Sequence, residues 1–211
     1  MSGLAIELAR GLGLTLALTA CAAAVALAAA LAAGLARSAK PHAVRWAAAA
    51  YVEVFRGTSA LVQLFWVYFV LPFAGIELGA FTAGVVVLGL NAGAYGAEVV
   101  RGAINAVPAG QRDAAAALNL SSAQTLVRVV LPQALPGMIA PAGNLAIELL
   151  KNTALVSMIA VHELTFTAQL LRASTLQTGI IFAVVLALYF AAASVIARAF
   201  RRLERHAAVT A

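Results

Sequence analysis

VRGAINAVPAGQRDAAAALNLSSAQTLVRVVLPQALP, residues 100–136, is the one long break in a chain otherwise built of bilayer-length apolar runs. The segment is polar and contains residues that favour a helix. A polar segment gains nothing from contact with lipid. We therefore expect it to project into water between two membrane spans and to contact another protein. On this reading the chain is one component of a larger assembly.

The composition is that of a membrane protein. Hydrophobic residues make up 64% of the 211 residues, and charged residues only 10%. Soluble domains average about 25% charged residues. The net charge of +6 does not indicate nucleic acid, because the basic residues stand at the edges of the apolar runs, where membrane topology places them. The single cysteine, Cys21, excludes an intramolecular disulfide.

Five stretches are long enough to cross a bilayer as helices, which takes about 20 apolar residues. They are residues 11–36, 59–78, 81–100, 138–161 and 178–197, with 79–80 as a tight hairpin. Backbone in lipid must satisfy its own hydrogen bonds, so each stretch is expected to be helical. The first is too long for a signal peptide and lacks a basic flank, which favours a retained span. The prediction is an all-α integral membrane protein whose residues 1–211 form a single transmembrane domain.

Arginine and lysine residues indicate how the spans are oriented. With five spans, eleven of them fall on one side, against Arg10 and Arg172 on the other: Arg37, Lys40, Arg45, Arg56, Arg101, Arg112, Arg128, Arg198, Arg201, Arg202 and Arg205. The basic side is expected to be cytoplasmic, which puts the N-terminus outside and the C-terminus in the cytoplasm. Residues 41–57 fall on that side, and we expect a short helix there at the membrane surface.

Polar residues inside two of the spans are candidates for a functional site, because polar groups at membrane depth are costly. In each of the two spans they recur at the helical spacing that places them on one face. They are Asn91, Tyr95 and Glu98 in the third span, and Asn144, Glu148, Lys151 and Asn152 in the fourth. The two faces are expected to meet near the midplane. Two interpretations stay open: a polar pathway in which Glu148 and Lys151 bind a zwitterion, or internal pairing that only fixes helix packing.

Glycine and proline residues also mark the third and fourth spans. Gly84, Gly89, Gly93 and Gly96 follow one another along the third, and small residues at such spacing let helices approach closely. Pro136 and Pro141 are expected to mark the start of the fourth span or a kink in it.

The 100–136 segment is expected to form two helices joined by a sharp turn. Asp113 opens an alanine-rich helix, and an acid suits a helix N-terminus. Asn119 interrupts the helix, since asparagine tolerates the left-handed conformation. Ser121 or Ser122 can cap the next helix, which is expected to end at Leu131, before Pro132.

These residues resemble a known family. The segment is similar to the cytoplasmic loop of bacterial ABC-transporter permeases, whose pattern is Glu-Ala-Ala, three residues, Gly, nine residues, Ile, one residue, Leu-Pro. The matching positions are Asp113, Ala114, Ala115, Asn119, Val129, Leu131 and Pro132, with Asp, Asn and Val as departures. Residues 54–63, 90–104, 143–144, 149–157, 163–165 and 168–171 resemble the permeases of polar amino acid uptake systems.

The resemblance implies an importer subunit in the bacterial plasma (inner) membrane, crossing it several times. It implies a coupling loop over 101–136 that docks on an ATP-binding subunit. The docking residues are expected to be Gln111, Arg112, Asp113, Ala114, Ala115, Leu118, Asn119, Leu120 and Ser121. The implied partners are a second permease, identical or a sister chain, two ATP-binding subunits and an extracytoplasmic solute-binding protein that delivers a polar amino acid. ATP and Mg are expected on the ATP-binding subunits, with no cofactor or metal on this chain.

Two other classes of function are weighed against this one. The chain has no Gly-x-x-x-x-Gly-Lys-Ser/Thr phosphate loop, so it is not expected to hydrolyse ATP by that route. A small intramembrane enzyme could use Glu98 or Glu148 as an acid or base. An ion-coupled carrier or channel is the other alternative. Neither accounts for the docking segment at 111–132.

Overall fold

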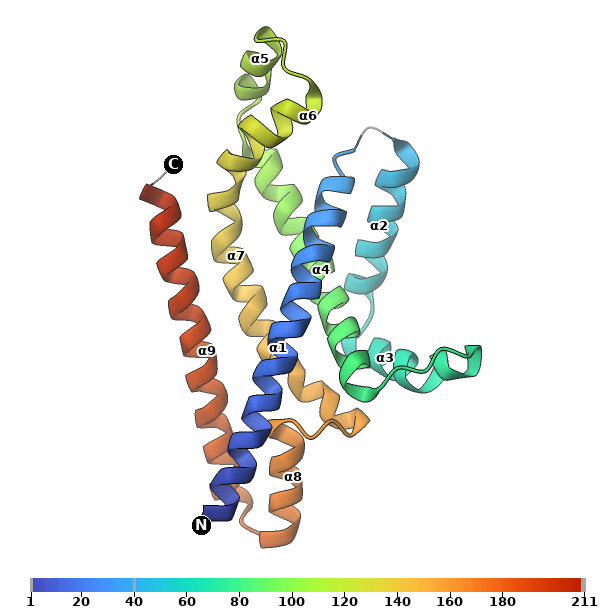
Figure 1. The fold of residues 1–211 in the computed structure, drawn as a ribbon, viewed down its shortest axis with the longest axis vertical. Helices are drawn as coiled ribbons and strands as arrows, with labels where there is room; N and C mark the ends of the chain where they lie inside the picture. The colour runs from blue at the N-terminus through green and yellow to red at the C-terminus, as the bar shows by residue number, and fades with distance from the viewer. Residues whose placement is uncertain (1, 40, 210–211) are drawn as a thin grey trace.

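The computed structural model describes residues 2–39 and 41–209, so Lys40, counted above among the basic residues, lies outside the described residues. All regular secondary structure in the described part is helical, and it contains no strand. Four long elements run along the molecule: α1 (Ser2–Ala36), α4 (Ala80–Ala106), α7 (Leu131–Asn152) and α9 (Thr178–Val209). Two short elements, α5 (Ala109–Ala117) and α6 (Ser122–Thr125), project beyond one end of this bundle (Figure 1). Residues 107–125 are called the elbow below.

The contact between α1 and α4 is built from small residues. A Cβ added at Gly93 would lie 2.7 Å from the Cβ of Ala29, and one at Gly89 would lie 2.7 Å from the Cβ of Val25. Real Cβ atoms do not come so close, so these positions admit only glycine at this separation of the helices. The glycine pattern of the third span therefore does allow the close approach predicted from the sequence.

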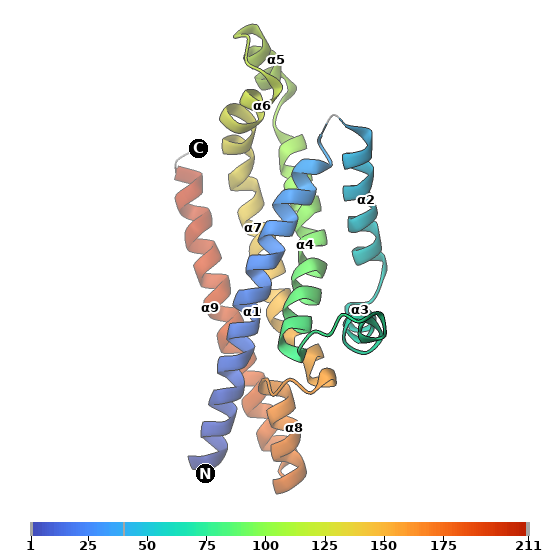
Figure 2. The same ribbon diagram turned by 45° about the vertical axis from the view of Figure 1, so that its right-hand side comes forward.

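The second span differs from the prediction. Residues 42–57 form α2 (His42–Gly57), which lies alongside α1 and α4 rather than apart from the bundle (Figure 2). The chain then turns through 104°, and residues 60–74 run sideways as α3 (Ala60–Phe65), a π-helical turn η1 (Trp66–Val70) and a 3-10 turn η2 (Leu71–Ala74). Residues 59–78 are therefore not one straight helix, and no hairpin forms at 79–80. The described residues contain four helices able to cross a membrane, or five spans if this broken pair is one.

Side-chain hydrogen bonds stabilise this break. Hydropathy does not reveal it, because the residues around the break still form an apolar run in the sequence. The Gln63 amide donates to the Thr58 hydroxyl at 2.7 Å and to the Phe55 carbonyl at 3.0 Å. These bonds satisfy backbone and side-chain groups that the interrupted helix leaves open, and such interruptions are tolerated where the protein itself covers them. On the inner face of α2, the side chains of Ala48 and Val52 are buried against Ala33 and Ala97.

The fourth span is longer than predicted. The helix does not end before Pro132; it passes from α6 through the π-helical turn η3 (Leu126–Val130) into α7, and then into the 3-10 segment η4 (Thr153–Ile159). Pro132 lies in the first turn of α7, directly after the π-helical turn η3. Pro136 and Pro141 lie inside the helix. The apolar span accordingly covers Ser122–Ile159 instead of 138–161.

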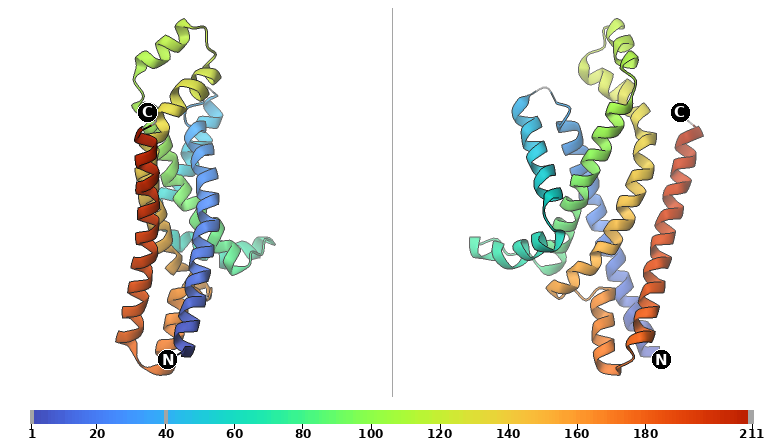
Figure 3. Two further views of the ribbon diagram at one scale, coloured as in Figure 1. Left: turned by 60° about the vertical axis from the view of Figure 1, so that its left-hand side comes forward. Right: turned by 180° about the vertical axis from the view of Figure 1, so that it is seen from behind.

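The end of the bundle opposite the elbow is closed by α8 (Leu164–Thr175). Figure 3 shows the start of α1 and α8 together at that end, whereas α9 ends on the side of the elbow. Leu8, Leu164 and Ile181 are buried together here and join α1, α8 and α9.

Candidate functional site

The elbow is a helix, a left-handed turn and a capped second helix, as the sequence predicted, but α5 begins at Ala109, so Asp113 lies inside this helix and does not open it. α5 ends at Ala117, and Asn119 has a φ of 55°, the conformation that asparagine accepts more readily than most residues. Ser121, rather than Ser122, is the cap. Its hydroxyl accepts from the backbone N–H of Gln124, while the Gln124 side chain accepts from the N–H of Ser121. This reciprocal capping box fixes where the second helix begins.

Contacts with the bundle hold the elbow on one side only. The Arg112 guanidinium donates to the carbonyl of Ile104 at 2.8 Å, so α5 is tied to the end of α4. The Gln111 side-chain oxygen accepts from the Gln133 amide at 3.3 Å. Ala115 is buried, whereas Leu118 is 75% exposed. The other docking candidates, Asp113, Ala114, Asn119 and Ser121, are exposed and Leu120 is half-buried. The elbow thus exposes polar and small side chains together with one large apolar side chain, that of Leu118.

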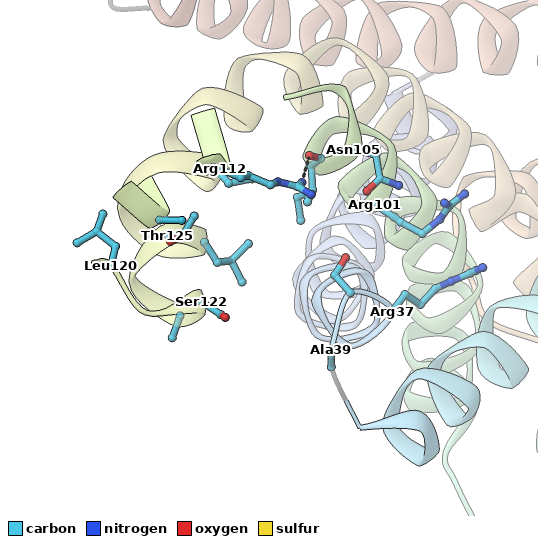
Figure 4. Close-up of a pocket in the computed structure, with 14 residues that line it drawn as sticks. Arg37, Ala39, Arg101, Asn105, Arg112, Leu120, Ser122 and Thr125 are labelled. Carbon is cyan, nitrogen blue, oxygen red and sulfur yellow. Dashed lines mark hydrogen bonds between the residues drawn. The ribbon is translucent and has the colours of Figure 1, made fainter. Parts of the chain in front are cut away.

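A cavity of about 800 Å³ separates the elbow from the bundle (Figure 4). It lies between Leu120, Ser122 and Thr125 on the elbow side and Ala39 and Asn105 at the ends of α1 and α4. Arg112 reaches across it from the elbow, while Arg37 and Arg101 extend away from the elbow in this view. The three guanidinium groups therefore do not converge on the cavity.

The polar faces of α4 and α7 meet in part. Asn91, Tyr95, Glu148 and Asn152 line one narrow gap between the two helices. Asn144 and Lys151 are exposed and do not line it. Glu148 and Lys151 form no ion pair with each other in the described part of the chain, so the internal pairing considered above is absent.

Asn91 also ties the broken span to the bundle. Its amide donates to the Phe55 carbonyl at 3.0 Å and to the Gln63 side-chain oxygen at 3.1 Å. The Tyr51 hydroxyl donates to the Leu90 carbonyl at 2.6 Å. Asn91 thus serves helix packing as well as bordering the gap. The sequence reasoning gave Tyr51, Phe55 and Gln63 no role in packing, because it placed the first two outside the membrane and counted Gln63 within an apolar run.

Glu98 is surrounded by three arginines. Arg101 donates to one carboxylate oxygen from two nitrogens, at 3.0 and 2.7 Å. Arg37 pairs with the other oxygen, and the guanidinium of Arg56 lies 4.0 Å from that same oxygen. These four residues are called the Glu98 cluster. The partners of Glu98 thus come from α2, the end of α4 and the residue that follows α1.

A second polar cluster lies at the opposite end of the bundle, around Glu163. This side chain is fully buried and caps α8 by accepting from the N–H groups of Thr165 and Phe166, each at 2.8 Å. The Tyr189 hydroxyl donates to it at 3.0 Å. Burial raises the pKa of the Glu163 carboxyl above its ordinary 4.5, although these hydrogen bonds work in the opposite direction.

Comparison with known proteins defines the class. The family described as "Binding-protein-dependent transport system inner membrane component" matches residues 24–207. The "Probable amino-acid ABC transporter permease protein y4tF" of Sinorhizobium fredii is 46% identical over 160 residues, which cover 73% of this chain and 67% of that protein. The "Glutamine transport system permease protein GlnP" of Escherichia coli is 37% identical over 160 residues, covering 75% and 73%.

Solved structures agree with this result. The structure described as "Crystal structure of an amino acid ABC transporter with histidines" superposes with a TM-score of 0.90 at 33% identity, covering 98% of this chain and 96% of that one. The fold and the matches define a multi-pass component of a membrane transport system. The chain belongs to the family of binding-protein-dependent transport system inner membrane components. The resemblance seen in the sequence is therefore confirmed.

Proposed function

We propose that the chain is the permease subunit of an ATP-driven importer that carries a polar amino acid delivered by an extracytoplasmic binding protein. The family match covers most of the chain, and relatives at 46% and 37% identity are named as amino-acid and glutamine permeases. The observation that carries the proposal is the elbow, a rigidly capped helical pair at one end of the bundle. Neither an enzyme nor an ion-coupled carrier needs such an element.

The elbow is cytoplasmic in this proposal. Arg112 and Arg128 belong to it or follow it closely, and α9 ends on the same side with Arg201, Arg202 and Arg205 in its last turns. Basic residues concentrate on the cytoplasmic side of membrane proteins. The N-terminus is then outside and the C-terminus in the cytoplasm. Arg56 no longer counts toward this argument, because it lies in the last turn of α2, at the end of that helix farther from the elbow.

The exposed side of the elbow docks on an ATP-binding subunit, which supplies ATP and Mg. Leu118 offers an apolar contact, and Asp113 and Asn119 offer polar ones, while Arg112 and Ala115 face the bundle and keep the elbow in register with α4. A movement of the ATP-binding subunit then reaches α4 and α7 directly. Two such permeases and two ATP-binding subunits form the complete complex.

The substrate pathway runs along the polar residues of α4 and α7. Asn91, Tyr95, Glu148 and Asn152 border the gap between the helices, Glu98 lies nearer the elbow, and Asn144 and Lys151 stand on the exposed side of α7. Exposed polar side chains at membrane depth need a polar neighbour. A second permease facing this surface supplies one.

Cross-linking tests the proposal. Asp113→Cys and Asn119→Cys, each on a Cys21→Ser background, are reconstituted with the candidate ATP-binding subunit and treated with a thiol cross-linker. We expect adducts with that subunit from both positions, and ATP-dependent amino acid uptake by the untreated complex. Ser174→Cys, exposed at the other end of the bundle, is the matched control and should form none. Adducts from position 174 but not from 113 and 119 would refute the docking role and the orientation together.

A further inference from the structure

The Glu98 cluster contains more positive charge than its single carboxylate can balance. Both oxygens of Glu98 are already engaged, one by Arg37 and the other by two nitrogens of Arg101. Arg56 comes no closer than 4.0 Å and forms no hydrogen bond within the described residues. Three guanidinium groups on one carboxylate leave an excess of two positive charges. Arg56 is the member of the cluster without an acceptor of its own.

Arg56 stands on the exposed side of α2, at the level of the middle of α4, where an unbalanced charge is costly. It stands in the last turn of α2, next to Phe55, whose carbonyl accepts from Asn91 near the middle of α4. Glu53, one turn earlier on α2, forms no ion pair with it in the described part of the chain. Charged residues at such depth face a polar cavity or bind something of opposite charge. The side chain of Arg56 is 39% exposed, so such a partner has access.

The surroundings of Arg56 indicate what kind of anion it binds. The carbon at the centre of its guanidinium lies 5.3 Å from the centroid of the Tyr95 ring, a cation–π contact. Tyr95 also borders the gap that contains Glu148 and Asn152. A cation without an acceptor and a carboxylate without a cation thus both adjoin Tyr95. A zwitterion with adjacent negative and positive groups is complementary to this arrangement.

We propose that Arg56 binds the α-carboxylate of the transported amino acid, while Glu148 receives its ammonium group. This inference rests on the proposed function and adds a residue that belongs to neither α4 nor α7. Neither Lys151, which the sequence suggested as the cation, nor Arg56 lines the gap, but Arg56 contacts Tyr95, which does. Arg37 and Arg101 are positioning residues: they occupy Glu98, so that its charge does not neutralise Arg56. A guanidinium binds a carboxylate through two parallel hydrogen bonds, which lysine cannot reproduce.

Uptake by the complete complex is the first test. The permease is reconstituted with its ATP-binding subunit and saturating binding protein, and a panel of radiolabelled L-amino acids identifies the one that is carried. Arg56→Met should lower the maximal uptake rate roughly ten- to a hundredfold, the equivalent of one charged hydrogen-bonded contact. Arg56→Lys should recover part of the loss. Arg45→Met, three turns earlier on α2, is the control and should leave uptake unchanged. Full uptake by Arg56→Met would overturn the inference.

A protection experiment separates binding from a structural role. Asn152→Cys, at a position that borders the gap, is placed on a Cys21→Ser background that keeps Arg56, and is modified in the complex with a methanethiosulfonate reagent. With Arg56 intact, the carried amino acid should slow this modification at least about tenfold more than its α-amide, which lacks the carboxylate but keeps the ammonium and the side chain. With Arg56→Met added, this difference should disappear. Equal protection by both compounds, or by neither, would overturn the inference. If the unmodified wild-type complex carries no amino acid with ATP, the proposed function itself fails, and this result is distinct from the other two.

Discussion

The side-chain amide of Asn91 donates to the backbone carbonyl of Phe55 at 3.0 Å and so joins the middle of α4 to the last turn of α2. The same amide reaches the Gln63 side chain, whose own amide donates to the same carbonyl. Asn91 and Gln63 together therefore cover the point at which the second span is broken. A polar residue that sequence reasoning assigned to a substrate pathway also holds the shape of the bundle.

Replacing Asn91 should loosen this junction. Asn91→Leu removes the donor to Phe55 and to Gln63, and we expect a loss of about 1 kcal/mol, the usual worth of a hydrogen bond between membrane helices. The detergent-solubilised variant should show a lower midpoint of thermal unfolding. Asn105→Leu, on an exposed position of the same helix, is the control. Equal midpoints for Asn91→Leu and the wild type would show that the junction carries no stability.

The contact between α1 and α4 allows a paired test with glycine. Gly93→Ala would place its Cβ 2.7 Å from that of Ala29, and such overpacking costs about 1–3 kcal/mol. Gly102→Ala on the same helix meets no atom within 4 Å, and alanine favours the helix, so this variant should be as stable as the wild type or more so. Thermal unfolding of both variants checks the prediction. Similar destabilisation at both positions would contradict it, since only Gly93 faces α1 at contact distance.

Local signals were the ones that sequence reasoning read correctly. Asn119 and Ser121 act on their own backbone neighbours, so their residue types indicate the turn and the cap without knowledge of the fold. The glycine stripe of α4 likewise predicted a close contact, although not which helix would provide it. The family resemblance depended on the same short-range patterns.

Contacts between residues far apart in the sequence could not be predicted from the sequence. The break after α2 depends on Asn91, which follows Phe55 by 36 residues. Glu98 pairs with Arg37, which lies 61 residues earlier in the chain. Hydropathy counts an apolar run without regard to a bend that such side chains satisfy. Arg56 was therefore counted as a surface charge, although the fold places it beside Tyr95.

The turn of the elbow gives a prediction that reaches function. Asn119 has a φ of 55°, which glycine adopts without strain and a β-branched residue does not. Asn119→Val should strain the turn by about 1–2 kcal/mol and shift the docking surface, lowering uptake per ATP hydrolysed. Asn119→Gly should keep the turn and most of the coupling. Parallel assays of uptake and ATP hydrolysis in proteoliposomes give the ratio. A normal ratio in Asn119→Val would mean that coupling does not depend on this turn.

Glu163 gives a prediction for the dependence of stability on pH. Burial raises the pKa of its carboxyl above 4.5, so in the folded protein the proton is held at pH values where the unfolded chain has lost it. Its contribution to stability is complete below pH 4.5 and is lost as pH rises through the higher folded pKa. Glu163→Gln keeps an oxygen that accepts from the N–H groups of Thr165 and Phe166, but it cannot ionise. Between pH 4.5 and 8, the midpoint of thermal unfolding should therefore fall less steeply with pH in this variant than in the wild type. Glu77→Gln, at an exposed position, should leave the slope unchanged. If Glu163→Gln follows the wild-type slope, this carboxyl is not the group that titrates, and its role is confined to capping α8.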